Sequence, residues 1–209
     1  SRRRHTRYIS VTGVQTCALP ISKWLTIPVL TANRTGQAIS ETRTDGQAWR
    51  RKHWNSWQAH YAHAAHFDAY RAGLQALYLG SEEDRLSQIN RSFLEAICSW
   101  LGIPTPLKWS HDIPHGATEP SERLVQICRA AGATHYLSGP AARNYLRADL
   151  FHAAGITVEW MDYSGYREYR QRASPFLHQV SALDLILNEG SRAPEFLKSR
   201  SAADMSHPA

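Results

Sequence analysis

Apolar and polar residues follow two different rhythms along the chain, and the change between them predicts the order of the elements. Residues 24–30 (WLTIPVL) are rich in β-branched side chains, which is typical of a buried strand. Ala38–Thr44 alternates and predicts the paired strand of a hairpin. From about residue 46 to residue 101, apolar positions recur every three or four residues, which predicts helices.

Three helices are expected in that segment. The first follows Asp45 as N-cap and places Trp49, His53 and Trp57 on one face, together with His60 or Tyr61. The second ends at Gly80 and turns four apolar side chains inward, namely Phe67, Tyr70, Leu74 and Leu77. The third, Arg85–Leu101, is capped by Ser81–Asp84 and carries an apolar stripe formed by Leu86, Ile89, Phe93, Ile97 and Leu101.

The second half of the chain alternates short strands with helices. Strands are expected at Thr105–Ser110, Thr134–Ser138 and Ile156–Met161. Helices are expected at Glu119–Ala131, from Ala141 onward, at Leu150–Ala154 and at Ser181–Leu187. This order predicts an α/β fold with a mostly parallel sheet flanked by helices, in which the helical segment of residues 46–101 is inserted between strands. Ligands of such sheets bind beyond the carboxyl ends of the strands, here near Ser138-Gly139 and Asp162-Tyr163.

The first 21 residues do not fit the rest of the chain. VTGVQTCALPI back-translates to the read-through of a common sequencing-library adapter, and SRRRHTR back-translates to its upstream part in the same frame. We therefore interpret residues 1–21 as an artefact of translation that is not part of the fold. The alternative is a natural basic tail. Residues 22–198 are then expected to form a single domain, and residues 199–209 a disordered tail.

Excluding residues 1–21 changes the balance of charge. Four of the 24 basic residues lie there, which leaves 20 against 18 acidic residues, a net charge of +2. A charge this small gives no reason to expect a nucleic-acid partner. The remaining cysteines, Cys98 and Cys128, lie in apolar helical patterns rather than in a disulfide framework, and no apolar run is long enough to span a membrane. We expect a cytoplasmic protein.

Two clusters on the first predicted helix are candidates for chemistry. His60, His63 and His66 recur at three-residue steps, which a zinc site could use, but a solvated helix face explains the same spacing and we expect no metal. The WRRKH segment places Lys52 and His53 beside Trp49 and Trp57. A cationic helix of this kind could hold a phosphate or a carboxylate, and an ordinary amphipathic helix is the alternative.

Two further candidates come from the second half. Ser138-Gly139 joins a strand to a helix, where a backbone turn can bind an anion, although the segment matches neither GxGxxG nor a P-loop. Asp184 follows Ser181 by three residues, as an acidic residue in the first turn of a capped helix does, and it could alternatively orient a base or bind a hydroxyl. A Ser–His–Asp hydrolase is not supported, because the sequence lacks a GxSxG elbow.

Taken in order, the motifs resemble those of the WbqC-like protein family. The matching pieces span nearly all of residues 23–190: WLTIPV, Trp49–His53, Tyr61 with Phe67, Ile89-Asn90, Leu101–Ile103, ERLVQICRAAGATHYLSGPAARNYL, Phe151, GITVEW and SALDLILNEG. The resemblance implies a bacterial protein of surface-polysaccharide (O-antigen, lipopolysaccharide) biosynthesis. For some members a transferase role has been proposed, including transfer of a glycine unit to a sugar.

The resemblance also suggests roles for individual residues. It implies a small-molecule substrate, either a nucleotide sugar or an activated acyl group, and it names no cofactor. We expect His53 and Asp184 to be catalytic, and Lys52, Arg123, Ser138 and Gly139 to bind substrate. The family's His-Gln-Pro and Leu-Pro-Trp segments are missing, so the chain is expected to be a fragment that lacks the first strand and helix and is inactive. The alternative is a non-catalytic sugar-binding or scaffold protein.

Overall fold

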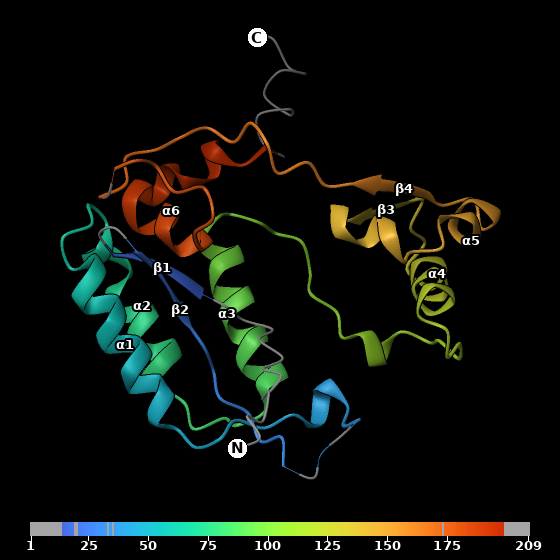
Figure 1. Ribbon diagram of the computed structural model, residues 1–209, viewed down its shortest axis with the longest axis horizontal. Helices are drawn as coiled ribbons and strands as arrows, with labels where there is room; N and C mark the ends of the chain where they lie inside the picture. Colours follow the sequence, from blue (N-terminus) through green and yellow to red (C-terminus); the bar gives the residue numbers. More distant parts are fainter. Residues whose placement is uncertain (1–13, 19–20, 33, 35, 173, 199–209) are drawn as a thin grey trace, which may run out of the picture. The chain divides into compact units, whose positions relative to one another are not determined.

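Figure 1 shows a computed structural model that describes residues 14–18, 21–32, 34, 36–172 and 174–198. The chain divides into two compact units. The larger, called the helical unit here, consists of Ser1–Pro104 and Arg167–Ala209, and the smaller, called the strand unit, is Thr105–Tyr166. The single domain expected over residues 22–198 stays a prediction. The expected tail at residues 199–209 and most of residues 1–21 lie outside the described residues.

The helical unit begins with a hairpin. Strand β1 (Val14–Ala18) pairs antiparallel with β2 (Ile21–Leu25), with Val14 opposite Leu25 and Ala18 opposite Ile21. The described part of residues 1–21, which we interpret as an artefact, therefore lies in β1 and at the first position of β2. The chain then forms a short 3₁₀ helix, η1 (Ile39–Glu41), before it enters the helices.

Four α-helices surround the core of the helical unit: α1 (Ala48–Tyr61), α2 (Phe67–Leu79), α3 (Leu86–Trp100) and α6 (Ala182–Glu189), which the 3₁₀ helix η4 (Gly190–Phe196) follows. The predicted faces are largely correct, because the apolar spacing matches the helical period. Trp49, His53, Trp57 and Tyr61 are buried on α1, as expected. Tyr78 on α2 is buried although it was not predicted, and its ring packs edge-on against Phe93 with centroids 5.0 Å apart.

The strand unit contains the parallel sheet. Strand β3 (His135–Ser138) pairs in parallel with β4 (Thr157–Trp160), and the connection between them runs through η3 (Pro140–Asn144) and α5 (Ala148–Ala153). Helix α4 (Pro120–Ala130) precedes β3, after the 3₁₀ helix η2 (Ser110–Asp112). The helices and strands of this unit pack around a small core, which consists of Val125, Cys128, Phe151 and Ile156. Burial raises the pKa of the Cys128 thiol, as expected for a packed, unreactive cysteine.

The predicted α/β class is confirmed: the chain is largely helical with a small parallel sheet flanked by helices, and helices α1–α3 lie between β2 and β3. Within the described residues, no helix is both long and apolar enough to cross a membrane.

Several local expectations were wrong, for physical reasons. Residues 105–110 form no strand, because Pro104 and Pro106 lack the N–H groups that a ladder requires. Residues 38–44 contain η1 and form no hairpin strand; Thr44 makes an isolated antiparallel bridge to Val29, and Arg43 makes another to Arg85. Asp45 does not cap α1, since Gly46 with φ +71° turns the chain between them and Gln47 occupies the N-cap position. The helix expected from Ala141 is the 3₁₀ helix η3.

Candidate functional site

A cleft of about 580 Å³ lies against the first two turns of α1, and we call it the α1 cleft. It is lined by Thr26, Pro28, Asp45, Ala48, Trp49, Lys52 and His53. Lys52 and His53, two of the predicted site residues, therefore lie in one cavity. Its volume is within the range of small-molecule sites.

Helix α1 brings these side chains together through its own geometry. Trp49 and His53 are four residues apart and lie one above the other, as Ala48 and Lys52 do on the neighbouring stripe. Trp49 and His53 are buried, with ring centroids 5.2 Å apart, while Lys52 is exposed. The buried rings of Trp49 and His53 therefore lie beside the exposed ammonium group of Lys52.

The hydrogen bond of His53 assigns its tautomer. Nε2 lies 3.2 Å from the carbonyl oxygen of Thr26, which can only accept, so Nε2 carries the proton. Any role of neutral His53 as a base then falls to Nδ1. The bond also ties α1 to the segment that follows β2 and fixes one wall of the cleft.

Trp49 contributes a buried donor to this wall. The indole is 3% exposed, and its Nε1 has no hydrogen-bond partner among the described residues. A buried N–H without a partner is uncommon in folded proteins and marks a place where a ligand oxygen or a water would be favourable.

The N-terminal end of α1 adds positive potential. No side chain caps its first turn and no acidic residue lies in that turn, as far as the described residues go. The unpaired N–H groups carry the positive end of the helix dipole, and Arg50, Arg51 and Lys52 follow directly. Asp45 is the one acidic residue in the described lining of the cleft.

Arg50 is held in a structural role that the sequence did not indicate. Its guanidinium donates to Gln47 Oε1 at 2.6 Å, to the carbonyls of Leu77 and Tyr78 at 3.3 Å each, and to that of Glu83 at 2.5 Å. Burial lowers the pKa of Arg50, and the Glu83 carboxylate partly opposes this. Because Leu77 and Tyr78 end α2, the cation neutralises the negative end of that helix.

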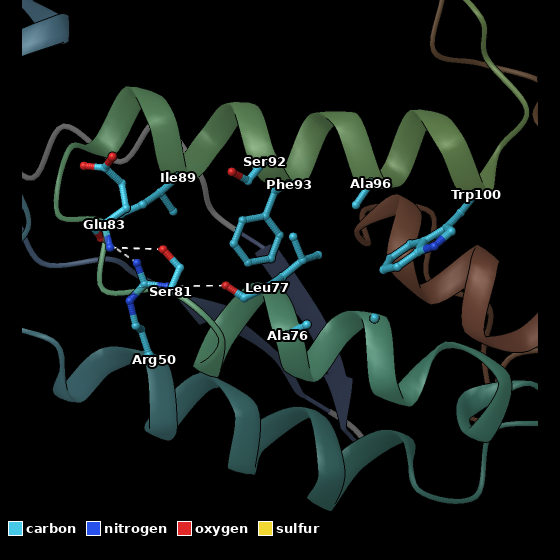
Figure 2. A pocket seen from close by; sticks show the side chains of 11 residues that line it. Arg50, Ala76, Leu77, Ser81, Glu83, Ile89, Ser92, Phe93, Ala96 and Trp100 are labelled. Atoms are coloured by element: carbon cyan, nitrogen blue, oxygen red, sulfur yellow. Dashed lines mark hydrogen bonds between the residues drawn. The ribbon is translucent and has the colours of Figure 1, made fainter.

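Figure 2 shows a separate cleft of about 420 Å³ between α2 and α3. The Arg50 guanidinium lies at one end, close to Ser81 and Glu83, and Trp100 lies at the other. Between them the walls carry small and apolar side chains, including Ala76, Phe93 and Ala96. This cleft contains none of the predicted site residues.

Asp184 occupies a different place in the helical unit, as a buried carboxylate with three donors. Its Oδ1 accepts from the Tyr61 hydroxyl at 2.7 Å, and its Oδ2 accepts from the Tyr169 hydroxyl at 2.6 Å and from Gln171 Nε2 at 3.0 Å. Ser181 caps α6 by accepting from the Leu183 N–H at 3.2 Å, which confirms the predicted cap. Because both oxygens are occupied, the arrangement favours a positioning role for Asp184.

The hydrogen bonds that hold Asp184 in place do not bring it to His53, so the two residues are not linked as a catalytic pair by these bonds. The partner of Asp184 on α1 is Tyr61, two turns beyond His53, which corresponds to about 12 Å along the helix axis. The other predicted residues lie in the strand unit. Arg123 is exposed on α4, and Ser138 and Gly139 end β3 and begin η3.

The turn at Ser138-Gly139 is a weaker anion site than expected. Pro140 occupies the first position of η3 and has no N–H, which removes one donor from the turn. The Ser138 carbonyl accepts a hydrogen bond from the Met161 N–H at 2.8 Å.

The histidines after residue 59 form no metal site within the described residues. His60 Nδ1 bonds to the Ser56 carbonyl at 2.7 Å, and the described residues contain no cluster of His, Cys, Asp and Glu able to hold a metal ion.

Comparison with known proteins shows what the chain as a whole is similar to. The model of the WbqC-like protein family matches residues 17–196. A Mycobacterium tuberculosis protein named Uncharacterized protein Rv1507c is 42% identical over 178 residues, which cover 84% of this chain and 76% of that protein. No solved structure matches the chain.

Proposed function

We propose, on the premise that the chain belongs to the WbqC-like protein family, that its α1 cleft binds the anionic part of an activated sugar or acyl donor. The protein would act in the cytoplasm as a transferase of bacterial surface-polysaccharide (O-antigen) biosynthesis. The observation that carries the proposal is the meeting of Lys52, His53 and Trp49 in one cavity at a helix end that no side chain caps.

The electrostatics of the cleft support an anionic ligand. An ammonium group and the positive end of a 14-residue helix act on the same volume. Phosphate is the anion that activated sugars and acyl adenylates share. Asp45, which also lines the cleft, would accept hydrogen bonds from hydroxyl groups and would repel a second anion.

His53 is the group in the cleft that suits proton transfer. Imidazole is a common general base in enzymes, and the bond from Nε2 to Thr26 holds the ring in one orientation. In a transfer reaction, His53 would take the proton of the attacking hydroxyl or amine as the new bond forms. The bond from the transferred group to the donor phosphate would break, and the phosphate would leave with the electron pair. Asp184 would not contact the substrate. Its hydrogen bond from the Tyr61 hydroxyl would hold α1 in position.

One observation favours a second candidate, a sugar-binding protein without catalytic activity. The Asp184 carboxylate is 2% exposed and already accepts three hydrogen bonds, so the predicted second catalytic group is poorly placed to contact a substrate. In that case the cleft would bind the same ligands without turning them over. Substrate contacts by Arg123, Ser138 and Gly139 stay predictions under either candidate.

Binding and turnover separate these candidates. Nucleotide sugars and acyl adenylates are titrated calorimetrically, and donor cleavage is followed by ³¹P NMR. Lys52→Ala should weaken binding by about tenfold or more, because it removes a charge-assisted contact, whereas Lys108→Ala in the strand unit should have no effect. His53→Gln keeps a donor for Thr26 and should abolish cleavage while binding survives. Binding without cleavage by the unaltered chain would favour the second candidate, and no binding would reject both.

A further inference from the structure

A second cleft borders the same helix on its other flank. It has a volume of about 640 Å³ and lies between α1 and the segment that joins α2 to α3, and we call it the loop cleft. Its lining includes Arg51, Asn55, Leu79 and Glu82. Two residues, Ala48 and Lys52, line both this cleft and the α1 cleft.

The helical period explains how two cavities share one ridge. Ala48 and Lys52 are four residues apart and form a stripe along α1. Trp49 and His53 lie on one side of this stripe and face the α1 cleft. Arg51 and Asn55 lie on the other side and face the loop cleft. The ridge between the clefts is therefore narrow, and its first residue has only a methyl side chain.

The ridge also carries positive charge. Ala48 is the first residue of α1, so its N–H group belongs to the unpaired end of the helix. Arg51 and Lys52 are exposed, and neither takes part in the ion pairs that the described residues form. An anionic group that crosses the ridge would meet both charges and would pass close to the backbone at Ala48.

From this geometry we infer that the ligand has two arms joined by a diphosphate and lies across the Ala48–Lys52 ridge, with one arm in each cleft. A nucleoside diphosphate sugar has this form. The inference rests on the proposed function and narrows it, since it selects an activated sugar over an activated acyl group.

The chemistry of each cleft assigns the arms. The α1 cleft offers the Asp45 carboxylate as an acceptor, and it is lined by Trp49, whose indole N–H has no partner among the described residues. An acceptor beside an unused donor suits the hydroxyl groups of a sugar. The loop cleft offers the Asn55 amide, which both donates and accepts as a base edge requires. Leu79 supplies apolar surface for the base, and the Glu82 carboxylate can accept from ribose hydroxyls.

The test compares intact ligands with their halves. UDP-, GDP- and dTDP-hexoses are titrated into the full chain, each beside its nucleoside diphosphate and its sugar 1-phosphate. At least one intact ligand should bind about tenfold or more tightly than either half, because linking two arms makes the second contact intramolecular. Acyl adenylates serve as the competing class, and tighter binding of these would overturn the choice of a sugar.

Variants locate the two arms. Asn55→Ala should weaken the nucleoside diphosphate and the intact ligand but not the sugar phosphate. Trp49→Phe, which removes the indole N–H, should weaken the sugar phosphate and the intact ligand but not the nucleoside diphosphate. Ala48→Leu should raise the ridge and weaken the intact ligand more than either half. Asn55 and Ala48 are exposed, so their variants keep the test valid if Trp49→Phe unfolds the protein.

The outcomes distinguish this inference from the proposed function. If a sugar phosphate binds in a Lys52-dependent manner and the nucleoside adds no affinity, the two-cleft ligand is wrong and the proposed function stands. If the two halves exclude each other from the protein, they share one cleft and the inference is again overturned. If no phosphorylated ligand of the panel binds, both are overturned.

Discussion

The Tyr61 hydroxyl on α1 donates a hydrogen bond of 2.7 Å to Asp184 on α6, and so joins two helices whose contacting residues are 123 positions apart. The same carboxylate accepts from Tyr169 and Gln171, and Gln171 in turn bonds to both backbone groups of Leu177. One buried charge therefore holds the first helix and the segment before α6 in place.

Removing these contacts should destabilise the helical unit. Tyr61→Phe should lower the free energy of unfolding by about 2 kcal/mol, the loss of one hydrogen bond to a charged group. Asp184→Ala should lower it by roughly 4 kcal/mol, because three donors lose their acceptor. Urea unfolding measures both. Tyr70→Phe is the control, since the Tyr70 ring packs against Trp100, and it should change the stability little. Equal effects of Tyr61→Phe and Tyr70→Phe would contradict the role given to Asp184.

Gly190 closes α6 in a backbone conformation that side chains disfavour, with φ +60° and ψ −128°. A Cβ at this position would lie 2.6 Å from the His66 ring. Gly190→Ala should therefore destabilise the protein by about 3 kcal/mol or more, from backbone strain and overlap together. Gly46→Ala is the matched control, with φ +71° and no atom within 4 Å of the added Cβ, and should cost about 1 kcal/mol. If Gly190→Ala and Gly46→Ala shift the denaturation curve equally, the His66 ring moves aside with no loss of stability and the expected overlap is wrong.

Glu119 caps α4 by accepting from the Glu122 N–H at 2.6 Å. This bond, with that from the Ser121 N–H, lowers the pKa of the Glu119 carboxyl below its ordinary value. Because the pKa of Glu119 is lower in the folded than in the unfolded chain, the contribution of this cap to stability is complete above the unfolded pKa. It is lost as the pH falls through the folded pKa. Between about pH 5 and pH 3, helicity of the strand unit should fall more steeply in the unaltered chain than in Glu119→Gln. Circular dichroism at a series of pH values checks this, and parallel curves would refute it.

The interpretation of residues 1–21 has its own test. If they are a translated adapter, DNA read from independent template without library adapters should differ upstream of codon 22 and should continue an open frame into the family's His-Gln-Pro strand. Recovery of the same codons from genomic DNA would show that the basic arm is natural. Nucleic-acid or membrane-surface binding would then have to be reconsidered, since four arginines would return to the charge balance.

The spacing of apolar residues predicted most helices, because a helix is formed by residues that are close together in the sequence. The 3.6-residue period found the buried faces of α1 and α3, and Gly80 and Gly102 marked the approximate ends of α2 and α3. The strand expected at residues 24–30 ends at Leu25 in the structure, because the segment after it turns its polar backbone to other partners, such as Thr26 to His53. Propensity alone does not show which backbone groups a strand will find.

The candidate site was only partly predictable for the same reason. Lys52 and His53 were found because they are adjacent in a motif. Asn55 was missed, although its spacing from Lys52 and Ala48 places it near their stripe and could have indicated it. Thr26 and Glu82 join the clefts from segments distant in the sequence, and no local pattern marks them. Asp184 was singled out as a first-turn acid or a catalytic group, but its burial and its three donors depend on residues elsewhere in the chain.

The most direct test of the site is to measure how fast Lys52 is acetylated, by mass spectrometry, with and without a nucleotide sugar. If an anion rests on the Ala48–Lys52 ridge, the ligand should slow the labelling of Lys52 by about tenfold while Lys108, in the strand unit, reacts at an unchanged rate. Labelling of Lys52 at the same rate in the presence of every nucleotide sugar tested would contradict the account.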